Sequence, residues 1–136
     1  MAGAVVQSKV LANRGTTGPS ASSIALAFTS NVAVGNRIVV VTTTEASGIT
    51  VSQVADNLGN QGSASGKFDQ LLNTADPFTG LQYVHSAPVT VGGACTVTST
   101  LAGGSTAWRS IAIYEISGVS LALGSACVAA SATAAT

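Results

Sequence analysis

Charged residues are scarce in this sequence: five Lys and Arg and five Asp and Glu account for 7% of 136 residues, and the net charge is zero. Globular chains usually carry about a quarter of their residues as charged ones. So few charges give a protein little electrostatic protection against association. We therefore expect a surface of small polar and apolar residues that is either protected in some other way or largely covered by partner molecules, and the scarcity of charge favours partners. The basic residues are scattered, which argues against a nucleic-acid partner.

Histidine and aromatic residues are scarce as well, and this limits the chemistry of any site. His85 is the only histidine, so a histidine-based metal cluster is excluded, and we expect its side chain to be half exposed on a strand. The carboxylates fall in separate segments and no serine lies in a nucleophile motif. We therefore predict that the protein is not an enzyme and has no catalytic residue, metal or cofactor.

Targeting signals are also missing from the sequence. Residues 1–9 have neither the basic start nor the apolar core of a signal peptide. No apolar run approaches the length of a membrane span. We therefore expect a chain made in a cytoplasm, with no membrane partner.

The two cysteines, Cys95 and Cys127, leave two interpretations open. They are compatible with one disulfide. Alternatively, they are two buried thiols that pack as small apolar side chains. The lack of an export signal slightly favours the thiols, because reducing compartments disfavour disulfides.

The stretch 108–119 is rich in β-branched and aromatic residues and predicts the central strand of the fold. Ile111 and Ile113 share one face, and the opposite face is also largely apolar. We therefore expect a strand that is covered on both sides. Arg109 and Glu115 lie near its ends, where we expect their long side chains to reach water.

The rest of the chain has about eight short strand-like segments separated by turns rich in Gly, Pro and Asn. Residues 23–29 alternate, which places Ile24, Leu26 and Phe28 in the core. Residues 38–41 are all apolar, and the threonines at 42–44 are expected to turn towards solvent. This pattern predicts an all-β fold, a jelly-roll-like or Ig-like antiparallel β-sandwich over residues 1–120.

Residues 121–136 are rich in Ala, Ser and Thr and contain no charge. We predict a C-terminal strand or extended arm that pairs with the sheet edge of a neighbouring subunit. The alternative is a disordered tail, because chain ends usually fray unless they are tied down.

Four motifs in a fixed order resemble a β-sandwich repeat family that occurs in phage structural proteins and in bacterial surface proteins. They are a V-x-D-x-x-G-N turn at 54–60, a strand with Tyr at 81–86, a G-G turn before a T-V-T strand at 92–98, and an A-I-x-E-x-S-G-V strand at 112–119. The resemblance implies a β-sandwich and brings no catalytic residues. The sequence departs from the family at 61–66, which are inserted, and at Ile116, where the family has Tyr.

These observations favour a viral structural protein, a cement or decoration protein that stabilises a phage capsid through contacts between subunits. Its partners would be copies of itself and a major capsid or other virion protein, and its location the virion. The residues expected at the interface are Val5, Val6, Trp108, Leu121, Leu123 and Val128. The alternative is an extracellular carbohydrate-binding or filament-forming module of a bacterial surface protein, in which Trp108, Tyr83 and Tyr114 would stack on a sugar.

Overall fold

A computed structural model describes residues 3–13, 21–44, 48–76, 80–106 and 108–119. Within these ranges the chain forms eight β-strands and no helix, so the predicted all-β class is confirmed. The strands are β1 (Ala4–Asn13), β2 (Ser23–Ala27), β3 (Arg37–Thr44), β4 (Thr50–Asp56), β5 (Asp69–Asp76), β6 (Gly80–Pro88), β7 (Thr96–Ala102) and β8 (Arg109–Ser117).

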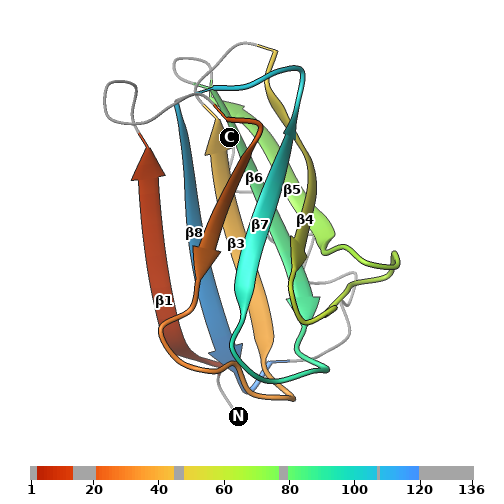
Figure 1. Cartoon of the computed structure of the whole chain (residues 1–136). Helices are drawn as coiled ribbons and strands as arrows, with labels where there is room; N and C mark the ends of the chain where they lie inside the picture. The colour runs from red at the N-terminus through yellow and green to blue at the C-terminus, as the bar shows by residue number, and fades with distance from the viewer. Residues whose placement is uncertain (1–2, 14–20, 45–47, 77–79, 107, 120–136) are drawn as a thin grey trace, which may run out of the picture.

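The strands form two sheets that face each other (Figure 1). The larger sheet has the order β1-β8-β3-β6-β5 and the smaller one the order β2-β7-β4, and every pair is antiparallel. The pairs β1–β8, β2–β7 and β3–β6 are nested, as when one long hairpin is rolled up. This nesting is the order of a jelly roll, except that β5 pairs with β6 in the larger sheet and not with β4.

The core lies between the inner faces of the two sheets. Ile24, Leu26 and Phe28 are buried there, as their alternation predicts. Along β8, Ile111 and Ile113 are completely buried. The residues that alternate with them face away from the second sheet and are only half-buried. β8 is therefore central within its sheet, and only one of its faces is covered by described residues.

Several polar residues lie deeper than the sequence predicts. Thr42 and Thr44 are completely buried, so the expected turn towards solvent is wrong. Arg109 and Glu115 are buried too, where we expected them to reach water. Each finds hydrogen-bond partners inside the sandwich, and a buried polar group that is hydrogen-bonded no longer needs water.

One of these buried groups links the two sheets directly. The hydroxyl oxygens of Thr42 on β3 and Ser99 on β7 lie 2.6 Å apart, and both side chains are completely buried. Replacing Thr42 with Val keeps the shape but leaves the Ser99 hydroxyl without this partner. We expect T42V to lower the free energy of unfolding by about 2 kcal/mol and T42V/S99A to recover most of it. Urea denaturation of the two single variants and the double variant measures this, and additive effects would contradict a coupled pair.

Candidate interface

The free edge of β1 carries the largest group of exposed apolar side chains among the described residues. Among the described strands β1 pairs only with β8, so the backbone groups along its other side have no described strand partner. The exposed apolar side chains of β1 are Val5 (60%), Val6 (54%), Val10 (64%) and Leu11 (42%). Lys9 is the only charged residue on the strand. A long apolar edge with one charge is weakly protected against pairing with another chain.

The pairing register explains how these side chains are presented. Val5 and Val10 lie opposite Ile116 and Ala112 of β8, on the face that points away from the second sheet. Val6 lies in a β-bulge, where the register shifts between Val5 and Gln7. The strand therefore exposes valines near its start and in its second half. The sequence predicts Val5 and Val6 at the interface, whereas Val10 and Leu11 belong to the same exposed edge and were not predicted.

A buried carboxylate holds β1 in place. Glu115 on β8 accepts hydrogen bonds from Gln7 Nε2 (2.6 Å), the Ala33 backbone N–H (2.8 Å) and Asn36 Nδ2 (2.7 Å). Gln7 also exchanges two hydrogen bonds of 3.1 Å with the backbone of Ser30. Burial raises the pKa of Glu115, but its three hydrogen bonds lower it further, so the net pKa is below the ordinary value. The ionised carboxylate thus fastens the edge strand to β8 and to the loop after β2.

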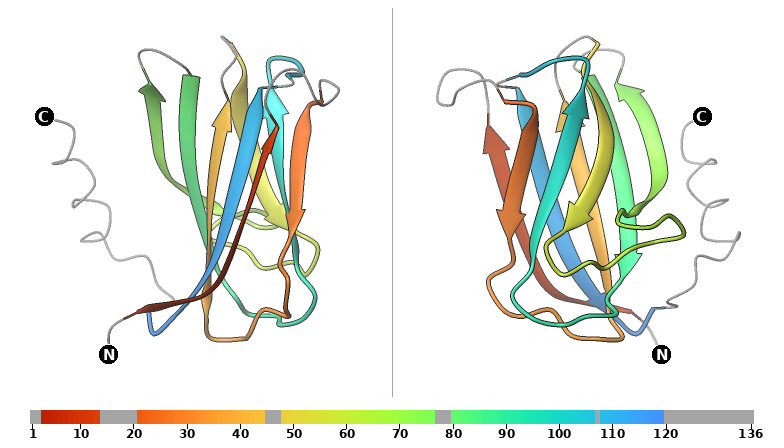
Figure 2. Two further views of the ribbon diagram at one scale, coloured as in Figure 1. Left: turned by 90° about the vertical axis from the view of Figure 1, so that its left-hand side faces the viewer. Right: turned by 45° about the vertical axis from the view of Figure 1, so that its right-hand side comes forward.

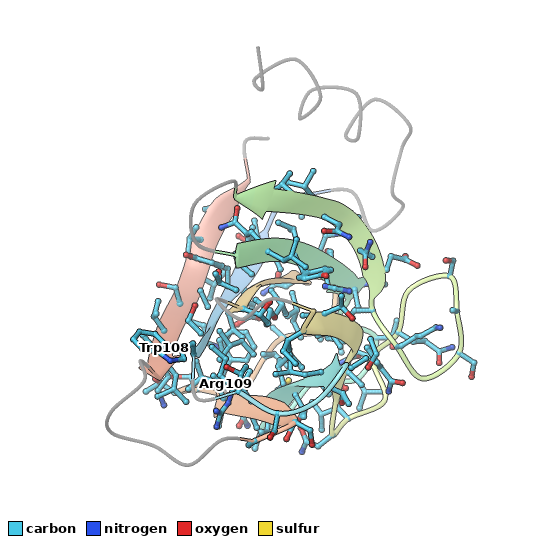
Figure 3. All side chains as sticks on the ribbon, turned by 90° about the horizontal axis from the view of Figure 1, so that it is seen from above. Trp108 and Arg109 are labelled. Carbon is cyan, nitrogen blue, oxygen red and sulfur yellow. The ribbon has the colours of Figure 1, made fainter. Side chains whose placement is uncertain are left out.

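Trp108 lies immediately before β8, beside the end of β1 (Figure 3). Its side chain is 46% exposed, and its backbone N–H donates to Thr106 Oγ1 at 3.0 Å. The neighbouring Arg109 is buried and donates from Nε to the Ser23 carbonyl of β2 at 3.1 Å and from Nη1 to the Thr106 carbonyl. Arg109 therefore fixes the start of β8, and the indole is held at the same end of the sandwich as Leu11.

The other predicted interface residues cannot be compared with the structure. Leu121, Leu123 and Val128 lie outside the described residues, as does the whole predicted arm at 121–136.

Cys95 is buried, and its thiol donates to Asp56 Oδ2 at 3.5 Å. Burial, and then the negative charge of Asp56, raise the pKa of this thiol to about 12, so it is protonated and unreactive at neutral pH. Cys127 lies outside the described residues, so a disulfide between the two stays a prediction.

The turn at 56–60 has its polar atoms occupied by protein groups. Asp56 Oδ1 accepts the backbone N–H groups of Leu58 and Asn60, each at 3.0 Å, and its Oδ2 accepts Asn60 Nδ2 at 2.8 Å. Gly59 has a φ of 81°, which glycine adopts without strain. These contacts hold the turn in place with groups of the protein itself.

His85 is buried, with 3% of its surface exposed, so the expected half exposure is wrong. It faces the core because it lies opposite Val40 in the register of β6 and β3. Its Nδ1 has no hydrogen-bond partner, and burial lowers the pKa of the imidazole to about 4. The ring stacks on Tyr83, with 6.4 Å between ring centroids. His85 is therefore neutral and part of the core at physiological pH.

The three aromatic residues considered for sugar stacking do not form one platform. Tyr83 faces the core and is 2% exposed. Tyr114 points away from the second sheet, on the opposite side of the larger sheet. Trp108 lies at the end of the sandwich (Figure 3). A stacking site would have to be built from one of them alone.

A shallow depression of about 290 Å³ lies on the outside of the smaller sheet. It is lined by small and polar residues of β4 and β7 and the turn after β4: Gln53, Ala55, Asp56, Asn57, Thr96, Thr98 and Thr100. Asp56 is already engaged in the turn. The depression offers hydroxyl and amide groups but no aromatic side chain, so it can offer a ligand polar contacts only.

The described carboxylates do not converge on a common site. Asp56 accepts hydrogen bonds within the turn at 56–60, Asp69 accepts hydrogen bonds from Ser63, and Glu115 accepts a hydrogen bond from Gln7 of β1. Within the ranges that the structure covers, no group of three His, Cys, Asp or Glu side chains is placed to hold a metal ion. No described helix is long and apolar enough to cross a membrane. Comparisons of the chain with protein-family models, with curated proteins and with solved structures gave no match.

Proposed function

We propose that this chain is a structural protein of a phage particle, a cement or decoration protein that stabilises a capsid lattice through contacts between subunits. The observation that carries the proposal is the free edge of β1, which is long, apolar and almost uncharged. An edge strand of this kind adds to the sheet of another subunit, where backbone hydrogen bonds give affinity and the valines give burial. The function is mechanical, because interface area stabilises the lattice.

Two further features support a viral setting. The jelly-roll order of the strands is common in viral capsid domains, although it also occurs in lectins, so the fold alone does not decide. The low charge of the sequence suits a surface that neighbours cover. The resemblance to the β-sandwich repeat family does not separate a viral setting from a bacterial surface, because that family occurs in both. The partners would be copies of this chain and a major capsid or other virion protein.

The alternative is a carbohydrate-binding or filament-forming module of a bacterial surface protein. The polar depression over β4 and β7 favours it, because hydroxyl and amide groups suit a neutral sugar. The separation of Trp108, Tyr83 and Tyr114 weakens it, because no stacking platform results. A filament would use the same β1 edge as a capsid lattice.

The edge can be tested with a charge placed on it. We expect the protein to self-associate, and Val10→Lys to weaken the association at least about tenfold, because a desolvated charge opposes strand pairing. Val34→Lys is the matched control, since Val34 lies in a loop and is as exposed (67%) as Val10 (64%). Light scattering over a concentration series measures the mass against the monomer mass of 13.3 kDa. Equal effects of the two variants would contradict a role for β1.

The virion assignment has its own test. Mass spectrometry of purified particles from the source that encodes this chain should detect it in a fixed ratio to the major capsid protein. Absence from the particles would contradict the viral assignment but leave assembly through β1 intact.

A further inference from the structure

The larger sheet has an outer face that no described segment covers. In Figure 2 the second sheet lies on one side of it, and no coloured segment crosses the other side. We use "outer face" for the positions whose side chains point away from the second sheet. On the three middle strands these are Ser110, Ala112, Tyr114 and Ile116 of β8, Arg37, Val39, Val41 and Thr43 of β3, and Gln82, Val84, Ser86 and Pro88 of β6.

On the three middle strands the outer face combines apolar and small polar side chains and is almost free of charge. Arg37, at one end, is its only charged side chain on the middle strands, and it is buried and donates to Ser86 Oγ at 3.0 Å. Val39, Val41 and Val84 lie near its centre and are half-buried. These valines form an apolar group within a face that also carries serine, threonine and glutamine side chains. A small uncharged segment can cover such a group.

The chain leaves β8 on the side of this face. A Cβ atom built on Gly3 would lie 3.6 Å from Ile116 Cγ2, an outer-face atom, and 2.7 Å from Val119 Cγ1. Val119 therefore lies next to the outer face at the point where β1 and β8 end. Gly118 has a φ of 70°, a left-handed conformation that lets the chain change direction after β8.

The residues that follow Val119 suit the outer face in composition, and they are long enough to run along it. Residues 120–136 contain no charge and consist largely of Ala, Ser and Thr with Leu121, Leu123 and Val128. As a helix they would span roughly 25 Å, and as a strand roughly 55 Å. β8, with nine residues, is roughly 30 Å long. Either form is long enough to run back along the sheet.

We propose that residues 120–136 dock on the outer face of their own larger sheet and complete the sandwich as a third layer. Attachment at Val119 gives the segment a high effective concentration at this face, which favours its own sheet over a neighbour's. The segment would cover Val39, Val41 and Val84 on the middle strands and leave the backbone edge of β1 free. This placement does not depend on the assembly role of β1.

Cys127 makes the docking directly testable, because it lies within the segment. A second cysteine is introduced on the outer face, in Val39→Cys and separately in Val41→Cys. The matched control is Thr98→Cys, on the outside of the smaller sheet. The native Cys95 is buried and does not compete. Each full-length variant is oxidised at low protein concentration, and the crosslinked peptides are identified by mass spectrometry, with a Cys127→Ser background as the blank.

We expect an intramolecular disulfide to Cys127 in at least one outer-face variant, formed about tenfold or more faster than in the Thr98→Cys protein. Equal rates at the outer face and at position 98 would overturn the proposal, as would no crosslink at positions 39 and 41. Disulfide-linked dimers through position 39 or 41 would also overturn it, because the segment would then come from another copy. A loss of crosslinking that follows unfolding is recognised by circular dichroism of the reduced variants.

Discussion

Asn60→Asp should lower the free energy of unfolding at neutral pH by about 4 kcal/mol, the largest effect that we expect from a single substitution in this chain. The Asn60 side chain is 1% exposed and joins two loops at one end of the sandwich. Its Oδ1 accepts the backbone N–H groups of Thr90 and Val91, each at 2.8 Å. Its Nδ2 donates to Asp56 Oδ2 at 2.8 Å and to the Val91 carbonyl at 3.1 Å.

Aspartate at this position keeps the accepting oxygen but loses the donating amide. A second oxygen would then face the Asp56 carboxylate and the Val91 carbonyl, and two like charges would be buried side by side. Protonation of one of the two carboxyl groups would restore a donor. The destabilisation of N60D relative to the wild type should therefore shrink as the pH falls from 8 to 4.5. A simple loss of packing would not give this pH dependence.

Urea denaturation at several pH values, with tryptophan fluorescence as the signal, measures this effect. Asn31→Asp is the matched control, because it makes the same chemical change on an exposed side chain. We expect N31D to change the stability by less than about 0.5 kcal/mol. If N60D lowers the free energy of unfolding at pH 8 by less than about 1 kcal/mol, the amide does not join the two loops.

The Asn60 contacts also show what the sequence could and could not predict. The motif at 56–60 predicts a turn, because Asp, Asn and Gly have strong local preferences, and the structure confirms it. The partners of Asn60 at 90 and 91 are distant in the sequence, so no local pattern identifies them. The same holds for the strands. Period-two alternation is a local pattern and predicts where strands occur, but the order of the strands in a sheet depends on long-range pairing.

The errors at Thr42, Glu115 and His85 share one physical cause. Each is a polar residue on a strand, and a sequence-based assignment places polar residues in water. In the fold, the register turns all three towards the core, at positions paired with Ile111, Ile38 and Val40. Thr42 and Glu115 find partners there from other elements, which no local pattern reveals. His85 lacks a partner at Nδ1 and contributes mainly a ring to the core.

The candidate interface was only partly predictable for a related reason. Val5, Val6 and Trp108 were identified because large apolar residues are conspicuous in a chain with few charges, and all three are exposed. Whether an apolar strand lies at an edge or in the centre depends on its neighbours. β1 and β3 are both rich in valine, but β3 lies between β8 and β6, and β1 has a described strand partner on one side only.

Acidification should destabilise the protein in two separate pH windows. The pKa of His85 is lowered to about 4 in the fold, against 6.5 for an ordinary histidine. Between pH 6.5 and 4 the unfolded chain therefore binds a proton that the folded chain does not, and stability falls as the pH falls. The full loss is about 3 kcal/mol at pH 4. The pKa of Glu115 is below its ordinary value of 4.5, so the stability that Glu115 contributes is present above that pH and is lost only below it.

His85→Leu separates the two windows. Leucine has a similar volume, and its apolar side chain suits the position next to Tyr83 and opposite Val40. Because His85 is the only histidine, we expect H85L to be nearly as stable at pH 7 as the wild type and to keep that stability down to about pH 4.5. Below pH 4.5 the free energy of unfolding of both proteins should fall, because Glu115 becomes protonated and its carboxylate no longer holds β1 in place. Urea denaturation at half-unit pH steps measures both curves. If H85L keeps the wild-type slope between pH 6.5 and 4.5, the buried imidazole is not the group that titrates.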